Sequence, residues 1–449
     1  MRRLLPALAL LTASSAAAET PRFPASLAGH AALPALTLLQ PPADAPALFL
    51  VSGRFAAQDR RRVEELGAIP TVAFTADKAA PRSSGVGLPL AGQPAQGMSG
   101  IVPTGPGRFL LLTDNGYGSR VSSPDTLLMV HAATADWTTG AITLGETVFL
   151  RDPDKKISFA IRTEGTAERY LTGADLDPES LAVVGGRWFI GDEFGPYLVE
   201  TDATGKVLAF HETLVDGKPV RSPDHFMLGQ LPAMPKGEAP FQVRRSRGFE
   251  PMAATPDGTR LIAMFEGPLF DATGEAEPFL RLLEFDVAGG AWSGKEWRYR
   301  REDDGNVIGD LAMIDATTAL VIERDDSSEG SPRLACPGEP KPDCFNKPAR
   351  FKRVYKIDLA ATDQGFVRKV GYVDLLDIAD PDGRSHAPAE PDGRFVFPFQ
   401  GPEGVAVVDA RTIAVINDNN LPYNAGRTLG KPDDSEIALL EVPELLAAR

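Results

Sequence analysis

The chain has 449 residues, 43% of them hydrophobic, with 46 Lys and Arg against 61 Asp and Glu and a formal net charge of −15. Nucleic-acid binders need a basic surface, so this acidic balance argues against a nucleic-acid partner. The acidic net charge first of all favours solubility, although an excess of carboxylates also suits cation binding. The chain exceeds the size at which one ordinary core stops growing, so we expect several domains or one modular domain.

The first 18 residues have the pattern of an export signal. Arg2 and Arg3 form a basic start, an apolar stretch follows from Leu4, and residues 16–18 offer a cleavage site of small residues. This apolar stretch is short and interrupted, and no later stretch approaches the length of about 18 apolar residues that a membrane span needs. We therefore predict a cleaved signal peptide, a periplasmic or secreted protein without a membrane span, and a single mature domain over residues 19–449.

Along the mature chain, short apolar runs alternate with Gly, Pro, Asp and Asn, as is typical of all-β proteins. The segment PALFLVSGRF at 46–55 predicts an early strand, and 57–70 is one of the few stretches that predict a helix. Five stretches then share one pattern: a small or acidic start, an apolar strand, a tight turn, a second strand and an acidic or amide cluster. They predict a repeated β-hairpin. These stretches are residues 97–116, 177–196, 249–268, 308–326 and 401–420.

The strands of these hairpins are apolar on both faces, as in RLIAMF at 260–265 and TIAVIN at 412–417. We therefore expect each strand to lie between neighbouring sheets. Four-stranded blades with long loops fit the spacing of the repeats, which predicts an all-β β-propeller of about six blades with a degenerate copy. Residues 46–55 and 436–444 are expected to pair and close the ring. A β-sandwich followed by a second β domain is the alternative architecture.

Two segments lack the hairpin pattern, 324–350 and 379–400, and are predicted as loop insertions.

The chain has two cysteines. Cys336 and Cys344 lie in the Pro-rich stretch CPGEPKPDC, and in an oxidising compartment a disulfide between them is the natural hypothesis. Such a small loop stabilises the fold by about 2–3 kcal/mol at most. A metal role for the thiols is disfavoured, because no histidine lies close to them in the sequence.

Acidic residues recur at both ends of the hairpins. In an antiparallel hairpin the start of the first strand lies beside the end of the second, so both sets fall at the same end. In a propeller these ends converge around the central channel, and carboxylates that are far apart in sequence can share one site. The acids at the start are Glu179, Glu250, Glu403 and Asp310, and those at the end are Asp114, Asp192, Glu193, Glu266, Glu323 and Asp418.

Converging carboxylates are costly unless they share protons or bind cations. Ca²⁺ suits such a site, because it takes about six to eight oxygen ligands, including the amide oxygens of residues such as Asn115 or Asn417. The five histidines do not recur in the hairpins, which disfavours zinc. The alternative interpretation is that the acids satisfy backbone amides in turns. The predicted Ca²⁺ ligands are Asp114, Glu179, Asp192, Glu250, Glu266, Glu403, Asp418 and Asn419.

Other catalytic signatures are weak, since the chain has no GxSxG elbow, Walker loop or Rossmann fingerprint. Two arginines adjoin the repeats: Arg120 follows DNGYGS, and Arg247 directly precedes GFEP. Arginine binds phosphate or carboxylate through paired hydrogen bonds, so we expect both residues to bind substrate. The alternative for Arg247 is an ion pair with Glu250 or with an acid of another blade.

Four of the hairpin stretches resemble a known family. DPESLAVVGGRWFIGDEFGP, RSRGFEPMAATPDGTRLIAMFEGPL and GPEGVAVVDARTIAVINDNN, with GMSGIVPTGPGRFLLLTDNG as the opening unit, are similar to the phytase-like family of exported bacterial proteins with esterase-like activity. The resemblance runs from about residue 97 to 444, with GDEFGP and NDNN as its more specific motifs. It implies a β-propeller, often Ca²⁺-binding, that hydrolyses phosphate or carboxylic esters. The acidic hairpin positions and Arg247 of RGFE are the residues that match.

These observations predict an exported, Ca²⁺-dependent hydrolase of phosphoesters, with Glu193 as general base and Arg247 bound to the phosphoryl group. We expect a monomer that acts on a small-molecule ester or phosphoester. One alternative is a lactonase or carboxylesterase propeller of the gluconolactonase type, with a single cation and few basic residues near it. Another is a propeller without enzymatic activity that binds a ligand or a protein partner, in which the acids serve structure.

Overall fold

The computed structural model describes residues 19–74, 81–228, 240–390 and 392–449. The predicted export signal lies outside these residues. Their secondary structure is almost entirely β, which confirms the predicted fold class. None of the helices in these four ranges is long and apolar enough to cross a membrane. The helical segments are η1 (Ala47–Leu50), η2 (Pro332–Leu334) and α1 (Pro443–Ala447).

The main strands form five antiparallel units of four strands, and each unit contains one of the predicted hairpins. Blade 1 is β6 (Met98–Gly105), β7 (Arg108–Thr113), β8 (Met129–Asp136) and β9 (Ala141–Phe149). Blade 2 is β10 (Pro178–Val184), β11 (Arg187–Asp192), β12 (Tyr197–Asp202) and β13 (Val207–Glu212). Blade 3 is β16 (Phe249–Ala254), β17 (Arg260–Phe265), β18 (Leu280–Asp286) and β19 (Ala291–Tyr299). Blade 4 is β20 (Asn306–Met313), β21 (Thr318–Asp325), β22 (Lys352–Asp363) and β23 (Phe366–Asp374). Blade 5 is β24 (Gly401–Val407), β25 (Thr412–Asp418), β26 (Ser435–Glu441) and β1 (Ser26–Leu33).

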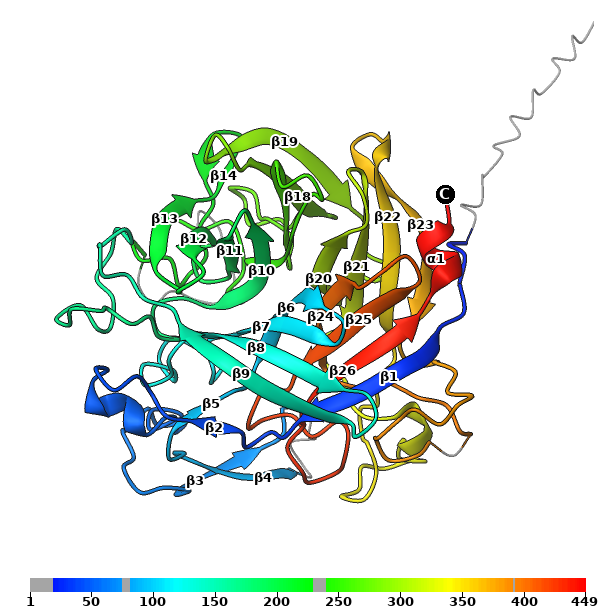
Figure 1. Ribbon diagram of the computed structural model, residues 1–449, viewed down its shortest axis with the longest axis horizontal. Coiled ribbons are helices and arrows are strands. Elements are labelled where there is room, and N and C mark those ends of the chain that lie inside the picture. Colours follow the sequence, from blue (N-terminus) through cyan, green and yellow to red (C-terminus); the bar gives the residue numbers. More distant parts are fainter. Residues whose placement is uncertain (1–18, 75–80, 229–239, 391) are drawn as a thin grey trace, which may run out of the picture.

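The first strands of the blades, β6, β10, β16, β20 and β24, contact one another in a closed ring. Figure 1 shows the blades arranged around these strands. Blades 5 and 1 also meet at their outer edges, where Ala32 of β1 pairs in parallel with Ala141 of β9. The fold is therefore a β-propeller. The prediction of about six blades is not confirmed, because the strands of the described residues make five four-stranded units and no sixth.

The ring closes differently from the prediction. β26 pairs with β1, with Ile437 opposite Ala31, and Figure 1 shows the blue β1 beside the red β26. Residues 46–55 instead form η1 and irregular backbone. The predicted helix at 57–70 is also wrong, since this stretch forms turns and the start of β3 (Ile69–Val72). Arg60 has a left-handed φ of 58°, which ends any helix there.

Apolar packing between blades explains why the strands lack an inside-outside alternation. Each of the five interfaces between neighbouring blades holds its own apolar cluster. Leu112 of blade 1 and Ile190 of blade 2 share one cluster, and Phe189 of blade 2 and Leu261 of blade 3 share the next. The middle strands are therefore covered on both faces, as the sequence predicted.

The two ends of the ring carry different connections. At one end the first two strands of each blade are joined by tight turns, such as Gly185-Gly186, where φ is 57° and 81°. At the other end lie the links from second to third strands and from blade to blade, which we call the long-loop end. Residues 326–351 and 375–400 are among these links. Its short strands are β2 (Leu38–Leu39), β3, β4 (Ser83–Leu88), β5 (Gln93–Pro94), β14 (Leu214–Val215) and β15 (Lys218–Pro219).

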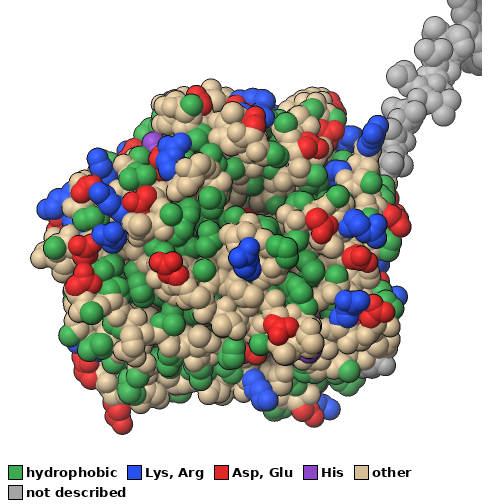
Figure 2. Space-filling model, viewed as in Figure 1, with side chains coloured by type: hydrophobic (Ala, Val, Ile, Leu, Met, Phe, Trp, Pro, Cys, Tyr) green, Lys and Arg blue, Asp and Glu red, His purple; other side chains and the backbone are tan. Residues whose placement is uncertain are grey.

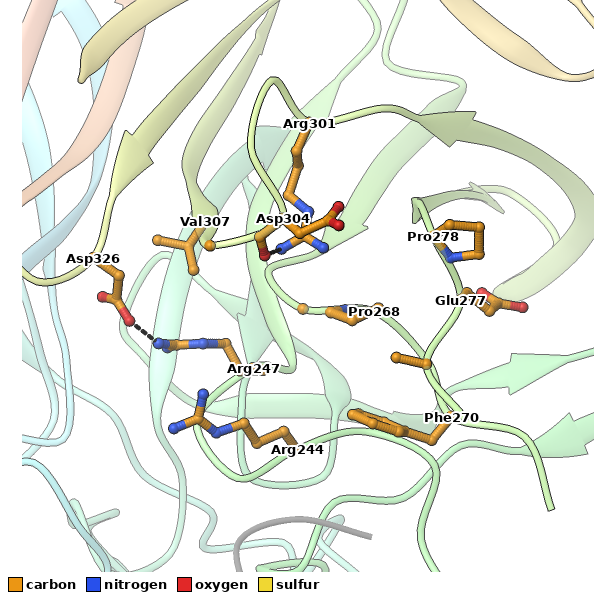
Figure 3. Close-up of a pocket in the computed structure, with 13 residues that line it drawn as sticks. Arg244, Arg247, Pro268, Phe270, Glu277, Pro278, Arg301, Asp304, Val307 and Asp326 are labelled. Atoms are coloured by element: carbon orange, nitrogen blue, oxygen red, sulfur yellow. Dashed lines mark hydrogen bonds and ion pairs between the residues drawn. The ribbon is translucent and has the colours of Figure 1, made fainter. Parts of the chain in front are cut away.

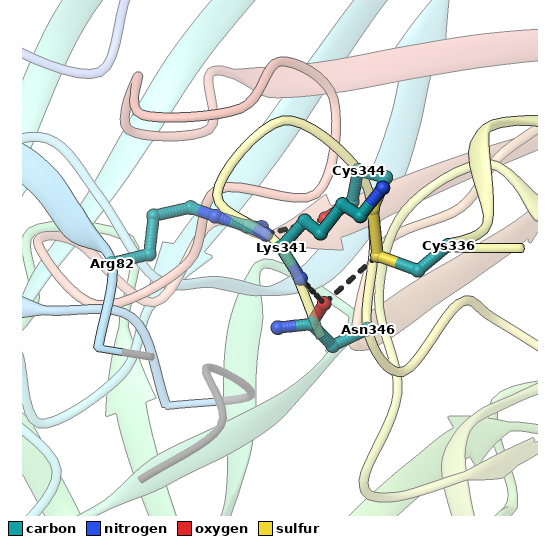
Figure 4. The surroundings of a disulfide bond; sticks show 5 residues. All are labelled: Arg82, Cys336, Lys341, Cys344 and Asn346. Carbon is teal, nitrogen blue, oxygen red and sulfur yellow. Dashed lines mark hydrogen bonds between the residues drawn. A yellow bond between two sulfur atoms is a disulfide. The ribbon is translucent and has the colours of Figure 1, made fainter. Parts of the chain in front are cut away.

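The loop at 326–351 is held in place by a disulfide and by hydrogen bonds from Arg82 and Lys352. A disulfide joins Cys336 to Cys344, as predicted, and Arg82 Nη2 donates a hydrogen bond of 2.6 Å to the carbonyl of Cys344 (Figure 4). The fully buried Lys352 donates to the carbonyls of Asp325, Ser328 and Gln400 at 2.8, 3.2 and 3.0 Å. This lysine therefore connects the loops on either side of blade 4's outer strands.

One face of the molecule is seen in Figure 2. Apolar side chains gather toward its middle, and acidic and basic side chains are interspersed around them. On this face the basic residues do not merge into a single patch.

Candidate metal centre

A cavity of about 260 Å³ lies at the long-loop end of the ring. All five blades contribute residues to it, and its wall contains nine carboxylates but two guanidinium groups. We call it the acidic cavity. Its carboxylates are Asp114, Asp177, Glu179, Glu193, Glu250, Glu266, Asp326, Glu403 and Asp418, and its arginines are Arg247 and Arg324.

β-Bulges place the acids that start the hairpins. The register between the first two strands shifts at Glu179 in blade 2, at Glu250 in blade 3 and at Glu403 in blade 5. A bulge inserts an unpaired residue and re-aims its side chain. The repeated acid in the sequence is thus the bulge residue of the innermost strand, and the bulge brings its carboxylate to the cavity.

Three groups of carboxylates in this cavity are close enough to share a cation. Within each group the ligand oxygens lie within 4.8 Å of one another, and all members are buried. Oxygen ligands at such separations suit a hard divalent cation, for which Ca²⁺–oxygen distances are about 2.3–2.6 Å. The groups are Asp177–Glu179–Glu193, Glu179–Glu250–Glu403 and Glu193–Glu250–Glu266.

Arg324 neutralises part of this charge. Its Nη2 lies 2.5 Å from Glu403, 3.4 Å from Glu266 and 3.8 Å from Glu250. The Arg324 side chain is 5% exposed, so these ion pairs are formed away from solvent. Because one guanidinium serves three glutamates, the two groups that contain Glu250 already have a counter-ion.

The remaining group, Asp177–Glu179–Glu193, has no such ion pair, although Arg247 acts on Glu193 electrostatically from farther away. None of its carboxylates forms an ion pair with a Lys or Arg in the part of the chain that the structure describes. These residues are 2%, 7% and 4% exposed, so water does little to screen their repulsion. In addition, Glu193 Oε1 is buried without a hydrogen-bond partner among the described residues. An unpartnered buried oxygen beside two further carboxylates fits a cation ligand set.

Burial and mutual repulsion raise the carboxyl pKa values in the cavity. Burial is the main cause for Glu179, Glu193 and Glu250, whose pKa values rise well above the ordinary range, and neighbouring carboxylates raise them further. Burial also raises the pKa of Asp177 to about 6. It raises the pKa of Glu266 to about 7, against the lowering effect of Arg247 and Arg324.

These shifts predict the pH dependence of the metal-free protein. The folded protein holds protons on these carboxyls that the unfolded chain has already lost, so stability falls as pH rises through the raised pKa values. We expect the free energy of unfolding in chelator to decrease between about pH 6.5 and 8, as measured by urea denaturation. Groups whose pKa is lowered in the folded protein have the opposite effect on stability, but they act largely outside this pH interval. Burial lowers the pKa of His131 and His225 to about 4 and that of Lys352 to about 8.

Ca²⁺ is expected to reduce this slope, since the bound cation replaces the protons. A flat or rising free energy of unfolding in chelator over the same interval would contradict the proposed charge state of the cavity.

Two predicted ligands have other partners. Asp192 accepts hydrogen bonds from the backbone amides of Asp177 and Gly195, both at 2.7 Å. Asn419 Oδ1 accepts from the Gly97 amide at 3.0 Å, and neither residue lines the cavity. For these two residues the turn interpretation fits the contacts. The predicted ligands that do line the cavity are Asp114, Glu179, Glu250, Glu266, Glu403 and Asp418.

Two other recurring acids of the hairpins also lie outside the cavity. Glu323 accepts hydrogen bonds from the Tyr299 hydroxyl at 2.7 Å and from Asn306 Nδ2 at 2.8 Å. Asp310 accepts from the Val405 amide at 2.7 Å and lines the channel rather than the acidic cavity. Both carboxylates join neighbouring strands, so their role in the structure is local.

The two predicted arginines differ in placement. Arg120 donates to the carbonyls of Ala174 and Asp224 at 3.0 and 2.6 Å and does not line the acidic cavity. Arg247 does line it, and it pairs with Glu266 of its own blade at 2.5 Å and with Asp326 of blade 4. The ion pair with another blade's acid, the alternative interpretation for Arg247, is therefore present.

Two central residues were missed by the sequence analysis. Asp177 precedes the hairpin strand by one residue, and its carboxylate accepts from Asn115 Nδ2 at 2.6 Å. Arg324 stands in IERDD, at the end of the second strand of blade 4. The position of Arg324 in the repeat could have revealed it, because Arg324 stands at the hairpin end where the other hairpins carry acids.

Comparison with known structures gives distant similarities. A luciferin-regenerating enzyme is 11% identical, with a TM-score of 0.34 and coverage of 78% of this chain and 79% of that one. The glutaminyl cyclase of Myxococcus xanthus is 12% identical, with a TM-score of 0.34 and coverage of 77% and 90%. The Dos1 propeller is 9% identical, with a TM-score of 0.30 and coverage of 82% and 71%. No curated protein matches the sequence.

A family model gives a stronger result. The model described as phytase-like, with esterase-like activity of phytase, matches residues 93–421. This range contains all five hairpins and every residue that lines the acidic cavity except Phe74. Because the match spans well over half of the sequence, the chain belongs to the phytase-like family.

Proposed function

We propose that the protein is a Ca²⁺-dependent hydrolase of phosphoesters. The observation that carries the proposal is the buried Asp177–Glu179–Glu193 group, which has converging oxygens and forms no ion pair with a Lys or Arg of the described residues. Arginines line the same cavity, so a cation site and an anion site adjoin. The family match supports esterase-type chemistry. The disulfide fits an oxidising compartment, which supports a periplasmic or secreted protein.

In this proposal Asp177, Glu179 and Glu193 hold the cation. When bound, Ca²⁺ would polarise the phosphoryl oxygen and make a nearby water more acidic. Glu193, the general base expected from the sequence, is thereby assigned to the ligand set. The adjacent Glu250 takes the role of proton acceptor, because its Oε1 has no hydrogen-bond partner among the described residues and it is 4% exposed.

Arg247 is assigned to the anionic part of the substrate. It lines the cavity, and its side chain is 16% exposed, compared with 5% for Arg324. During hydrolysis a water oxygen forms a new bond to phosphorus and the ester oxygen leaves. Glu250 accepts one proton from the water and then gives this proton to the leaving oxygen, which becomes an alcohol, so that Glu250 is regenerated. Atoms and charge balance without a further reactant.

The test is an assay of the purified protein with 4-nitrophenyl phosphate, bis(4-nitrophenyl) phosphate and 4-nitrophenyl acetate, each with Ca²⁺ and with chelator. We expect turnover of a phosphoester that chelator removes and Ca²⁺ restores. Absence of Ca²⁺-dependent turnover for both phosphoesters would overturn the proposal.

A lactonase or carboxylesterase with one cation is the second candidate. The specific observation in its favour is that one of the three carboxylate groups, Asp177–Glu179–Glu193, forms no ion pair with a Lys or Arg of the described residues, which suits a single bound ion. Turnover of 4-nitrophenyl acetate or of a lactone, with none of the phosphoesters, would favour this candidate. Ligand binding without turnover of any ester would favour a propeller that is not an enzyme.

A further inference from the structure

A second cavity adjoins the acidic cavity. It has a volume of about 390 Å³ and is formed by the loop after β17 and the connection from β19 to β20 (Figure 3). Arg247 and Asp326 line both cavities, and their ion pair forms the partition between them. We call this second cavity the arginine pocket. The two cavities therefore share a wall, and a ligand that occupied both would contact this ion pair.

The walls of the arginine pocket combine apolar and charged side chains. Among the apolar ones, Pro268, Phe270 and Pro278 come from the loop of blade 3, and Val307 comes from the first strand of blade 4. A pocket of this size with an apolar part and several charged groups suits a small organic molecule that itself carries charge. The apolar part of the wall is available to an apolar group of such a ligand.

Two arginines give the arginine pocket its charge. Arg244 and Arg301 line it, and Figure 3 shows them approaching from opposite sides. Arg301 Nη1 donates to the backbone carbonyls of Asp304 and Asn306 at 2.7 and 2.8 Å, and this leaves its other nitrogens without a carboxylate. Neither Arg244 nor Arg301 forms an ion pair with any carboxylate of the described residues.

Two acids of the pocket pair with arginines other than Arg244 and Arg301. Glu277 pairs with Arg281 at 2.6 Å, and Asp326 pairs with Arg247 and Arg324. The exposed side chain of Asp304 acts on Arg301 electrostatically but forms no ion pair with it. Arg244 and Arg301 can therefore donate hydrogen bonds to an anion from outside the chain, because arginine binds carboxylate and phosphate through paired hydrogen bonds.

We propose that the arginine pocket binds the non-reacting part of the substrate, and that this part is an apolar group carrying a second anion, either a carboxylate or a phosphate. The inference rests on the proposed function, since the reacting ester is taken to lie in the acidic cavity. It narrows the substrate class from phosphoesters in general to those whose alcohol part is an apolar organic anion.

The test is calorimetric titration of the Ca²⁺-loaded protein with three non-hydrolysable probes: phenylphosphonate, 4-carboxyphenylphosphonate and 1,4-phenylenebisphosphonate. One additional charge-assisted contact is expected to tighten binding about tenfold over phenylphosphonate. The bisphosphonate tests whether phosphate serves as well as carboxylate. Arg244→Gln, Arg301→Gln and the double variant are expected to lose the advantage of the second anion while binding phenylphosphonate as before.

Arg411→Gln is the matched control, because this exposed arginine lies on the tight-turn side of blade 5 and is expected to retain the tenfold advantage. Equal affinities for all three probes in the wild type, or an advantage that persists in the double variant, would overturn the inference. Failure of the proposed function is distinguishable. If no ester is hydrolysed but the probes are discriminated, the arginine pocket stands as a ligand site and the hydrolase proposal falls.

Discussion

The variant Glu179→Gln is expected to weaken Ca²⁺ binding by at least about a hundredfold, since changes to residues behind the ligands already cost about 10–100-fold in metal sites. Glu179 belongs to two of the three carboxylate groups. One of these is the group that forms no ion pair with a basic residue. Glutamine keeps the size of the side chain and removes its charge. Titration calorimetry with Ca²⁺ measures the effect, and Ca²⁺-dependent hydrolysis is expected to fall with it.

Asp192→Asn is the matched control for this experiment. Glu179 and Asp192 lie at the same end of one hairpin, on its first and second strands, but Asp192 accepts backbone hydrogen bonds from Asp177 and Gly195 and does not line the cavity. We expect Asp192→Asn to lower stability and to leave Ca²⁺ affinity within a few-fold of the wild type. If both variants lost affinity equally, the loss would reflect damage to the hairpin and not the removal of a Ca²⁺ ligand.

The variant Arg324→Gln is expected to destabilise the metal-free protein at pH 8 by about 3–5 kcal/mol, the usual cost of removing one partner from a buried ion pair. Glu250, Glu266 and Glu403 share this guanidinium, so its loss leaves three carboxylates facing one another. Added Ca²⁺ is expected to restore much of the stability, because a cation that binds only the folded state stabilises it by mass action. Urea denaturation with and without Ca²⁺ measures both effects.

Arg260→Gln is the control, since Arg260 pairs with Glu284 at 3.1 Å on the outer part of blade 3. A partly exposed pair of this kind contributes about 0–1 kcal/mol, and Ca²⁺ should not alter that. If Arg324→Gln cost no more than Arg260→Gln, the view of Arg324 as the counter-ion of these glutamates would be wrong.

The sequence predicted the repeating unit well, and the reason is physical. A strand buried on both faces must be apolar throughout, and a hairpin needs a tight turn. The two inner strands of each blade can therefore be recognised in the sequence. The outer strands are less apolar, as in β9 and β19, and they carry no repeated signal. The number of blades and the pairing of β26 with β1 depend on these outer strands; the predicted number of about six is not confirmed, and the predicted partner of β26 is wrong.

The site was predicted in part for a similar reason. Acids at matching positions in different blades converge, so Glu179, Glu250 and Glu403 were found from their spacing. Position alone does not reveal where a carboxylate points, and Asp192 caps a turn although Glu193, its neighbour, faces the cavity. Arg324 was missed because its charge is opposite to that of the acids at the equivalent positions.

The central claim is that Asp177, Glu179 and Glu193 hold a divalent cation in the acidic cavity. The most direct test is a crystal structure grown with Ca²⁺, in which anomalous scattering locates the ion. We predict one peak with oxygens of these three carboxylates at about 2.3–2.6 Å, and Arg324 still paired with Glu403. A cavity that contains water alone at saturating Ca²⁺ would contradict the claim.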